Sequence, residues 1–203
     1  MRHLTTVALV LNLGVASLYA QQFGEEHATG RRVKMRFSGS IISSPLSLAP
    51  GTLNHEEHLA GNSTLGPFTY RGLWADDPAT RTFGNCGSGF GPNFQLATGG
   101  GVFRFEDGSL LTVRLTEGVL CVDFSDPARP VGYLSETFQI TGGTGRFDGI
   151  AASCGMTAGD CTLQLIATRS IVLRDSAGAV KFMTSVGEIE GTVPRFGRGE
   201  ERQ

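Results

Sequence analysis

Apolar and polar residues alternate along most of this chain. In the stretch VKMRFSGSI, Val33, Met35, Phe37 and Ile41 alternate with polar residues. A period of two gives a β-strand one buried and one solvated face. No segment of helical length shows an apolar period near 3.6 residues. The pattern predicts eight strands, at residues 33–43, 57–61 running into 66–74, 93–105, 110–115, 118–124, 133–140, 146–154 with 162–173, and 179–193.

Short turn sequences separate several of these segments. EDGS, at Glu106 to Ser109, and DSAG, at Asp175 to Gly178, both have the composition of tight hairpin turns. The chain contains 29 glycines, which fits many short turns. We therefore predict an all-β meander, closed into a barrel or, alternatively, folded as a β-sandwich.

One stretch, ITGGTGRFDGIAA, contains three glycines within four residues and resembles a phosphate-binding loop. Such a loop leads into a helix, whereas the residues that follow here have a β-like pattern and lack the required lysine. We interpret the stretch as a sharp turn at a barrel corner. In this interpretation Gly142, Gly143 and Gly145 supply positive φ angles, Phe147 returns to the core, and Gly149 allows a bend.

The two ends of the chain differ from the middle. Residues 1–20 have a basic start, an apolar stretch and a small residue before a polar segment, as in a secretory signal peptide. Residues 21–32 are predicted to be a flexible linker, 33–193 a single barrel domain, and 194–203 a disordered tail. We expect a secreted or periplasmic protein without a membrane span.

Four cysteines lie in the predicted exported part: Cys86, Cys121, Cys154 and Cys161. An even number in an exported chain favours disulfides, for which three connectivities exist. Cys154 and Cys161 bracket a turn-rich segment, so their pairing would pin a hairpin end and leave Cys86 for Cys121. The spacing lacks CxxC pairs and does not favour zinc.

The charge pattern excludes some function classes. The net charge is −2 and no basic cluster is present, so nucleic-acid binding is not expected. NHEEH, at Asn54 to His58, is the densest polar cluster; on a strand His55 and His58 would point to opposite faces, which disfavours a metal site. We interpret the cluster as a solvated strand edge. No GxSxG nucleophile motif is present, and we expect neither metal nor cofactor.

Several charged residues lie within apolar strands. Arg169 shares its parity with Leu163 and Leu165, which predicts that its side chain points into the barrel. A buried charge needs a partner, and Glu188 or Glu190 is the predicted one. The pair would anchor a ligand; the alternative is an ion pair at the surface or barrel end. The remaining candidate ligand contacts are apolar-face aromatics, namely Phe103, Phe105 and Phe138.

Three segments together resemble the allene oxide cyclase and dirigent barrel families, especially small secreted bacterial proteins of that group. They are the Gly-Thr-Gly-x-Phe turn of ITGGTGRFDGIAA, STLGPFTYRG (Ser63 to Gly72) and GGGVFRFEDGSLL (Gly99 to Leu111). The resemblance covers residues 33–193 and implies an eight-stranded antiparallel barrel with an apolar interior, trimeric in many plant relatives. Ala152 stands where those relatives often carry glycine. No catalytic residue of the cyclases has a matching position.

These observations lead to one functional expectation and two alternatives. We expect an extracytoplasmic barrel that binds a small apolar ligand or acts as an interaction module, without enzyme activity. The first alternative is a cyclase, isomerase or dirigent-like protein that guides a reactive apolar intermediate without a covalent nucleophile. The second is a structural envelope protein whose barrel is packed with side chains.

Overall fold

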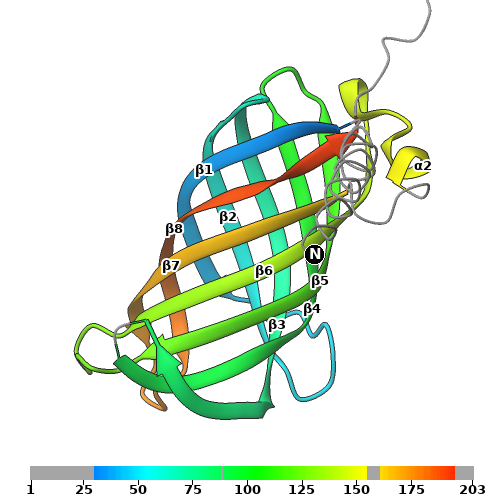
Figure 1. Ribbon diagram of the computed structural model, residues 1–203. Helices are drawn as coiled ribbons and strands as arrows, with labels where there is room; N and C mark the ends of the chain where they lie inside the picture. The colour runs from blue at the N-terminus through cyan, green and yellow to red at the C-terminus, as the bar shows by residue number, and fades with distance from the viewer. Residues whose placement is uncertain (1–29, 88, 155–160, 195–203) are drawn as a thin grey trace, which may run out of the picture.

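The chain forms a closed antiparallel barrel of eight strands, each paired with its neighbours in sequence, with β8 closing on β1 (Figure 1). The computed structural model describes residues 30–87, 89–154 and 161–194. The predicted barrel is confirmed and the sandwich alternative is wrong. The strands are β1 (Gly30–Ser43), β2 (Leu53–Ser63), β3 (Gly66–Cys86), β4 (Gly89–Phe105), β5 (Leu110–Asp123), β6 (Val131–Gly143), β7 (Thr162–Arg174) and β8 (Val180–Pro194).

The predicted number of strands is correct, but two divisions between them are wrong. Residues 57–61 and 66–74 belong to separate strands, β2 and β3, because Gly66 has a φ of 102° and the chain reverses just before it. Conversely, 110–115 and 118–124 lie in one strand, β5. The register shifts between Leu115 and Glu117, a bulge that moves the buried positions from odd to even numbers. Both divisions were predicted wrongly because a bulge and a turn interrupt the alternation of apolar and polar residues in the same way.

The two predicted hairpin turns are confirmed. EDGS joins β4 to β5, with Gly108 at a φ of 81°, and DSAG joins β7 to β8, with Gly178 at 84°. These left-handed conformations are the ones that glycine adopts at little cost.

The segment after β6 differs from the predicted strand at 146–154. It forms a short 3-10 helix, η1 (Gly145–Phe147), and one turn of helix, α2 (Ile150–Cys154), at one end of the barrel (Figure 1). Gly145 has a positive φ, as predicted, and Gly149, for which only a bend was predicted, has one too. Gly142 and Gly143 do not, because both are still paired within β6. Phe147 is buried, as predicted, with its ring 5.1 Å from that of Phe105.

The barrel domain begins and ends close to its predicted limits. β1 starts at Gly30, so the last three residues of the predicted linker are strand. β8 ends at Pro194. The predicted signal peptide, the rest of the linker and residues 195–203 of the predicted tail lie outside the described residues.

Both predicted disulfides are present, Cys86–Cys121 and Cys154–Cys161, with Cα–Cα distances of 5.7 and 5.5 Å. The first ties the end of the β3–β4 hairpin to β5. The second ties the last residue of α2 to Cys161, just before β7.

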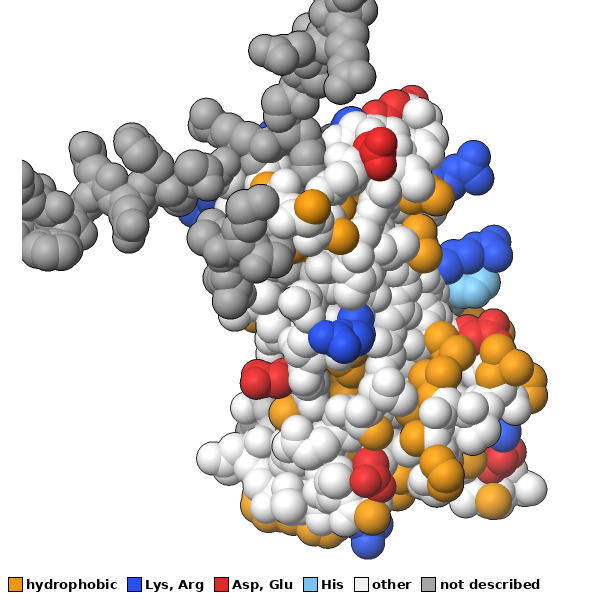
Figure 2. Space-filling view, turned by 90° about the vertical axis from the view of Figure 1, so that its right-hand side faces the viewer, with side chains coloured by type: hydrophobic (Ala, Val, Ile, Leu, Met, Phe, Trp, Pro, Cys, Tyr) orange, Lys and Arg blue, Asp and Glu red, His pale blue; other side chains and the backbone are white. Residues whose placement is uncertain are grey.

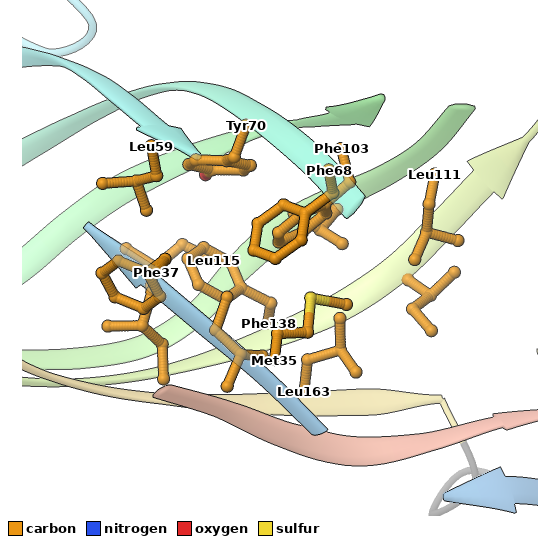
Figure 3. Packing of buried hydrophobic residues seen from close by; sticks show 14 of the residues in the cluster. Met35, Phe37, Leu59, Phe68, Tyr70, Phe103, Leu111, Leu115, Phe138 and Leu163 are labelled. Atoms are coloured by element: carbon orange, nitrogen blue, oxygen red, sulfur yellow. The ribbon is translucent and has the colours of Figure 1, made fainter. Parts of the chain in front are cut away.

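Aromatic and aliphatic side chains fill the barrel near the β4–β5 turn (Figure 3). The rings of Phe68, Tyr70 and Phe103 pack against one another, with centroid distances of 4.6 Å for Tyr70–Phe103 and 5.7 Å for Phe68–Phe103. Met35 and Leu163 are completely buried in the same cluster. This part of the interior is therefore closed by side chains.

Candidate functional site

A cavity of about 360 Å³ opens at the barrel end formed by the β1–β2, β3–β4, β5–β6 and β7–β8 hairpins. Its volume lies in the range of small-molecule sites. Most of its wall is apolar, and the apolar contributors from four strands include Phe94, Leu120, Val122, Ile171 and Met183. Two buried ionisable residues, His55 and Asp76, also line it.

His55 and Asp76 form a hydrogen-bonded pair within this lining. His55 Nε2 lies 2.9 Å from Asp76 Oδ1, and the side chains are only 9% and 6% exposed. The ring of His55 stacks on that of Trp74, its cross-strand neighbour, at a centroid distance of 4.2 Å. Because a carboxylate only accepts, Nε2 carries the proton, and in the neutral ring Nδ1 is left as an acceptor.

A buried ion pair also contacts Trp74. The Arg169 guanidinium lies over the Trp74 ring at 4.5 Å, and its Nη2 donates to Glu57 Oε1 at 3.0 Å. Arg169 and Glu57 are 0% and 1% exposed. Successive contacts thus link His55, which lines the cavity, through Trp74 and Arg169 to Glu57.

A third carboxyl group, that of Glu136 on β6, has no arginine of its own. Glu136 is 2% exposed. Burial raises its pKa to about 8; the nearby charge of Glu57 adds to the shift and Arg169 opposes it. Burial also raises the pKa of Glu57, while the attraction of Arg169 lowers it. One guanidinium thus serves two buried carboxyls, and at neutral pH Glu136 holds a proton.

The same layer has hydrogen-bonding capacity that the protein does not use. Among the described residues, seven buried side-chain nitrogen and oxygen atoms have no hydrogen-bond partner. They belong to His55, Glu57, Trp74, Glu136, Arg169 and Ser185. Ser185 is the cross-strand neighbour of Arg169. Buried polar atoms are almost always satisfied in proteins, by water where not by protein, so this layer favours a polar guest.

The predicted inward direction of Arg169 is confirmed, but its predicted partners are wrong. Glu188 and Glu190 lie on the outer face of β8, where both contact Lys34 and Glu190 also contacts Arg32. The inward positions of β8 have odd numbers, such as Ser185 and Ile189, and the two glutamates have even numbers. The alternative, an ion pair of Arg169 with these glutamates at the surface or barrel end, is therefore wrong as well, because Arg169 is buried and pairs with Glu57.

The three predicted aromatic contacts do not reach the cavity. Phe103, Phe105 and Phe138 are at most 2% exposed and belong to the packed part of the interior. They support the barrel and do not line the site.

The sequence interpretation missed His55, Glu57, Asp76 and Glu136. NHEEH is not a solvated edge, because His55 and Glu57 point inward while His58 is exposed. A signal was present: His55 and Glu57 share the parity of Leu59. Glu136 likewise shares the parity of Leu134 and Phe138, which are buried on the same face of β6. No group of three potential ligands for a metal ion occurs among the described residues.

Searches against protein-family models, curated proteins and solved structures found no match to this chain. In the described segments, none of the helices is long and apolar enough to cross a membrane.

Proposed function

We propose that this protein binds a small, mainly apolar molecule in the cavity, with a hydrogen-bonding group of the ligand placed against His55 and Asp76. The observation that carries the proposal is an apolar cavity of about 360 Å³ lined by a single buried, mutually oriented His–Asp pair. Few polar groups in an apolar wall are typical of small-molecule sites, where they set orientation and specificity. The cavity also argues against a barrel that is packed from end to end.

The charges of the site favour a particular polar group on the ligand. The buried guanidinium of Arg169 already donates to Glu57. Arg174 and Lys181 also line the cavity, and Lys181 pairs with Asp175. A carboxylate placed against the His–Asp pair would meet the acceptor Nδ1 of His55 and the like charge of Asp76. A hydroxyl, amide or amine donates a hydrogen bond and complements them.

Two further parts of the proposal rest on less specific support. The disulfides favour an extracytoplasmic location, as expected for an exported chain. The closed eight-stranded barrel supports, at the level of fold alone, membership of the allene oxide cyclase and dirigent barrel group.

Native mass spectrometry of the gently purified protein tests the binding proposal. We expect an adduct of a few hundred daltons. Replacing Ile171, which lines the cavity, with Trp should fill the site and remove the adduct. Ile166→Trp is the matched control, because Ile166 lies on the same strand but is 62% exposed on the outside. An adduct that survives Ile171→Trp would place the ligand elsewhere.

A second candidate, an isomerase or cyclase that moves a proton, is favoured by the same His–Asp pair. Such a pair can exchange a proton with a bound molecule, with Asp76 orienting the ring of His55. If so, the copurifying ligand should incorporate deuterium when incubated with the protein in heavy water, and His55→Phe should abolish the exchange. Binding without exchange would support the binding function alone.

A further inference from the structure

The cavity is surrounded by exposed apolar side chains. Of the twelve large exposed hydrophobic residues in the described part of the chain, nine lie in or beside the four hairpins at this end. All four hairpins contribute. Figure 2 shows apolar side chains gathered over the lower part of one face, which corresponds to the hairpin end in Figure 1. We call six of them the rim: Leu46, Leu53, Phe83, Phe90, Phe124 and Leu173, which are 38–63% exposed.

The rim is held outward by the fold. Phe83 and Phe90, on paired strands, stack at 6.5 Å and are 61% and 63% exposed. The Cys86–Cys121 disulfide fixes the end of this hairpin to β5. The two rings therefore stay in solvent, where apolar surface is unfavourable unless something covers it.

Two arginines accompany the aromatic residues of the rim. The Arg81 guanidinium lies 5.5 Å from the centre of the Phe83 ring, and that of Arg174 lies 5.3 Å from the centre of Phe124. Neither arginine forms an ion pair with any described residue. The nearby carboxylates, in contrast, accept backbone N–H groups of their own turns; they are Asp77, Asp123, Asp126 and Asp175. The rim therefore presents two guanidinium groups, those of Arg81 and Arg174, that no carboxylate neutralises.

We propose that the rim docks on a phospholipid surface, with its apolar side chains inserted among the lipids and Arg81 and Arg174 at the level of the phosphates. Aromatic residues and arginine are the side chains that settle at a membrane interface, because each combines an apolar part with a polar one. The free guanidiniums complement phosphate groups. Docking by this end would also open the cavity directly to the lipid, although lipid binding itself does not depend on a ligand in the cavity.

A second copy of the chain fits this surface less well. In a two-fold dimer through the rim, the same patch meets itself, so Arg81 and Arg174 of both copies come together. The apolar contact would then be opposed by repulsion between cations. A phosphate layer offers the opposite charge.

Vesicle flotation tests the proposal with vesicles of phosphatidylcholine and of a phosphatidylcholine–phosphatidylglycerol mixture. We expect the protein to float with both and more strongly with the anionic mixture. Phe83→Ser with Phe90→Ser should weaken binding at least about tenfold. The matched control is Ile166→Ser with Val186→Ser, which removes equally exposed apolar side chains from the barrel wall and should leave vesicle binding unchanged.

The role of the two arginines is tested separately. Arg81→Glu with Arg174→Glu should abolish the preference for the anionic mixture, whereas Arg71→Glu, on the wall, should not.

Three outcomes would overturn the proposal: no flotation with either vesicle, equal loss in the rim and wall variants, or a dimer in solution that the rim variant dissociates. The last would make the rim an interface between copies. Thermal melting of the rim variant checks its folding, which should be intact because both phenylalanines are exposed. The adduct in native mass spectrometry reports the cavity separately, so failure of lipid docking leaves the proposed ligand binding standing.

Discussion

Arg169 on β7 donates a hydrogen bond to Glu57 on β2 across the interior of the barrel, over a separation of 112 residues in sequence. The Nη2–Oε1 distance is 3.0 Å and neither side chain is accessible to solvent beyond 1%. Strands β8 and β1 lie between β7 and β2 in the sheet, so the pair joins parts of the wall that do not hydrogen-bond to each other. Each charge is stabilised by the other, because almost no solvent reaches either side chain.

Breaking this pair should destabilise the protein strongly. Arg169→Met leaves the carboxylate of Glu57 buried without its donor, and the expected loss in the free energy of unfolding is about 3–5 kcal/mol. The measurement is urea unfolding at neutral pH. Arg36→Met, at an exposed position of β1, is the control and should stay within about 0.5 kcal/mol of the parent.

The double variant Arg169→Met with Glu57→Met should recover much of that loss. Two apolar side chains of similar length replace a desolvated ion pair, which is often neutral or stabilising. The double-mutant cycle gives the coupling between the two positions. Additive losses would show that the pair contributes packing and not a coupled charge interaction.

The sequence pattern predicted the number of strands and the inward face of β7, but not every strand boundary and not the pairing of charges inside the barrel. Alternation placed Arg169 on the inner face because Leu163 and Leu165 share its parity. Its partner could not be found in the same way, because Glu57 lies on a strand that contacts β7 only through the barrel interior. The bulge in β5 shows a related limit. One extra residue, Thr116, moves the inward-facing positions from odd to even numbers, and the amino-acid composition of the strand does not reveal this change.

Glu136 should make stability depend on pH in an unusual direction. Its folded-state pKa is raised from 4.5 to about 8, so between these values the folded state holds a proton that the unfolded state has lost. The stabilisation present below pH 4.5 is therefore lost as the pH rises to about 8, at up to about 1.4 kcal/mol per pH unit.

Comparison with Glu136→Gln isolates this effect. Glutamine cannot titrate and keeps the shape of the protonated acid, so the difference in unfolding free energy between parent and variant should change over this pH interval and be constant above it. Glu117→Gln, at an exposed position of β5, is the control. A parallel pair of pH profiles would mean that Glu136 is ionised in the folded state.

The two disulfides should differ in their contribution to stability. They close loops with sequence separations of 35 and 7 residues. On the loop-entropy model, removing Cys86–Cys121 by Cys→Ala substitution at both positions costs about 4 kcal/mol and removing Cys154–Cys161 about 2 kcal/mol. Thermal and urea unfolding of the two double variants test this order. Thiol titration of the denatured, unreduced parent should find no free thiol; two or more would contradict the pairing.

The His55–Asp76 pair should determine how well the cavity holds a ligand that donates a hydrogen bond. N-phenylnaphthylamine, a neutral aromatic molecule with one N–H group, is a suitable fluorescent probe for titration. His55→Phe keeps the stack on Trp74 but removes the acceptor, and we expect the affinity for the probe to fall about tenfold, the value of one hydrogen bond. Asp76→Asn should have a smaller effect, because the amide oxygen still accepts from Nε2. His58→Phe changes the outward histidine of the same strand and should leave binding unchanged. Equal affinities for all four proteins would mean that the apolar wall alone binds the probe, and the His–Asp pair would then have no part in recognition.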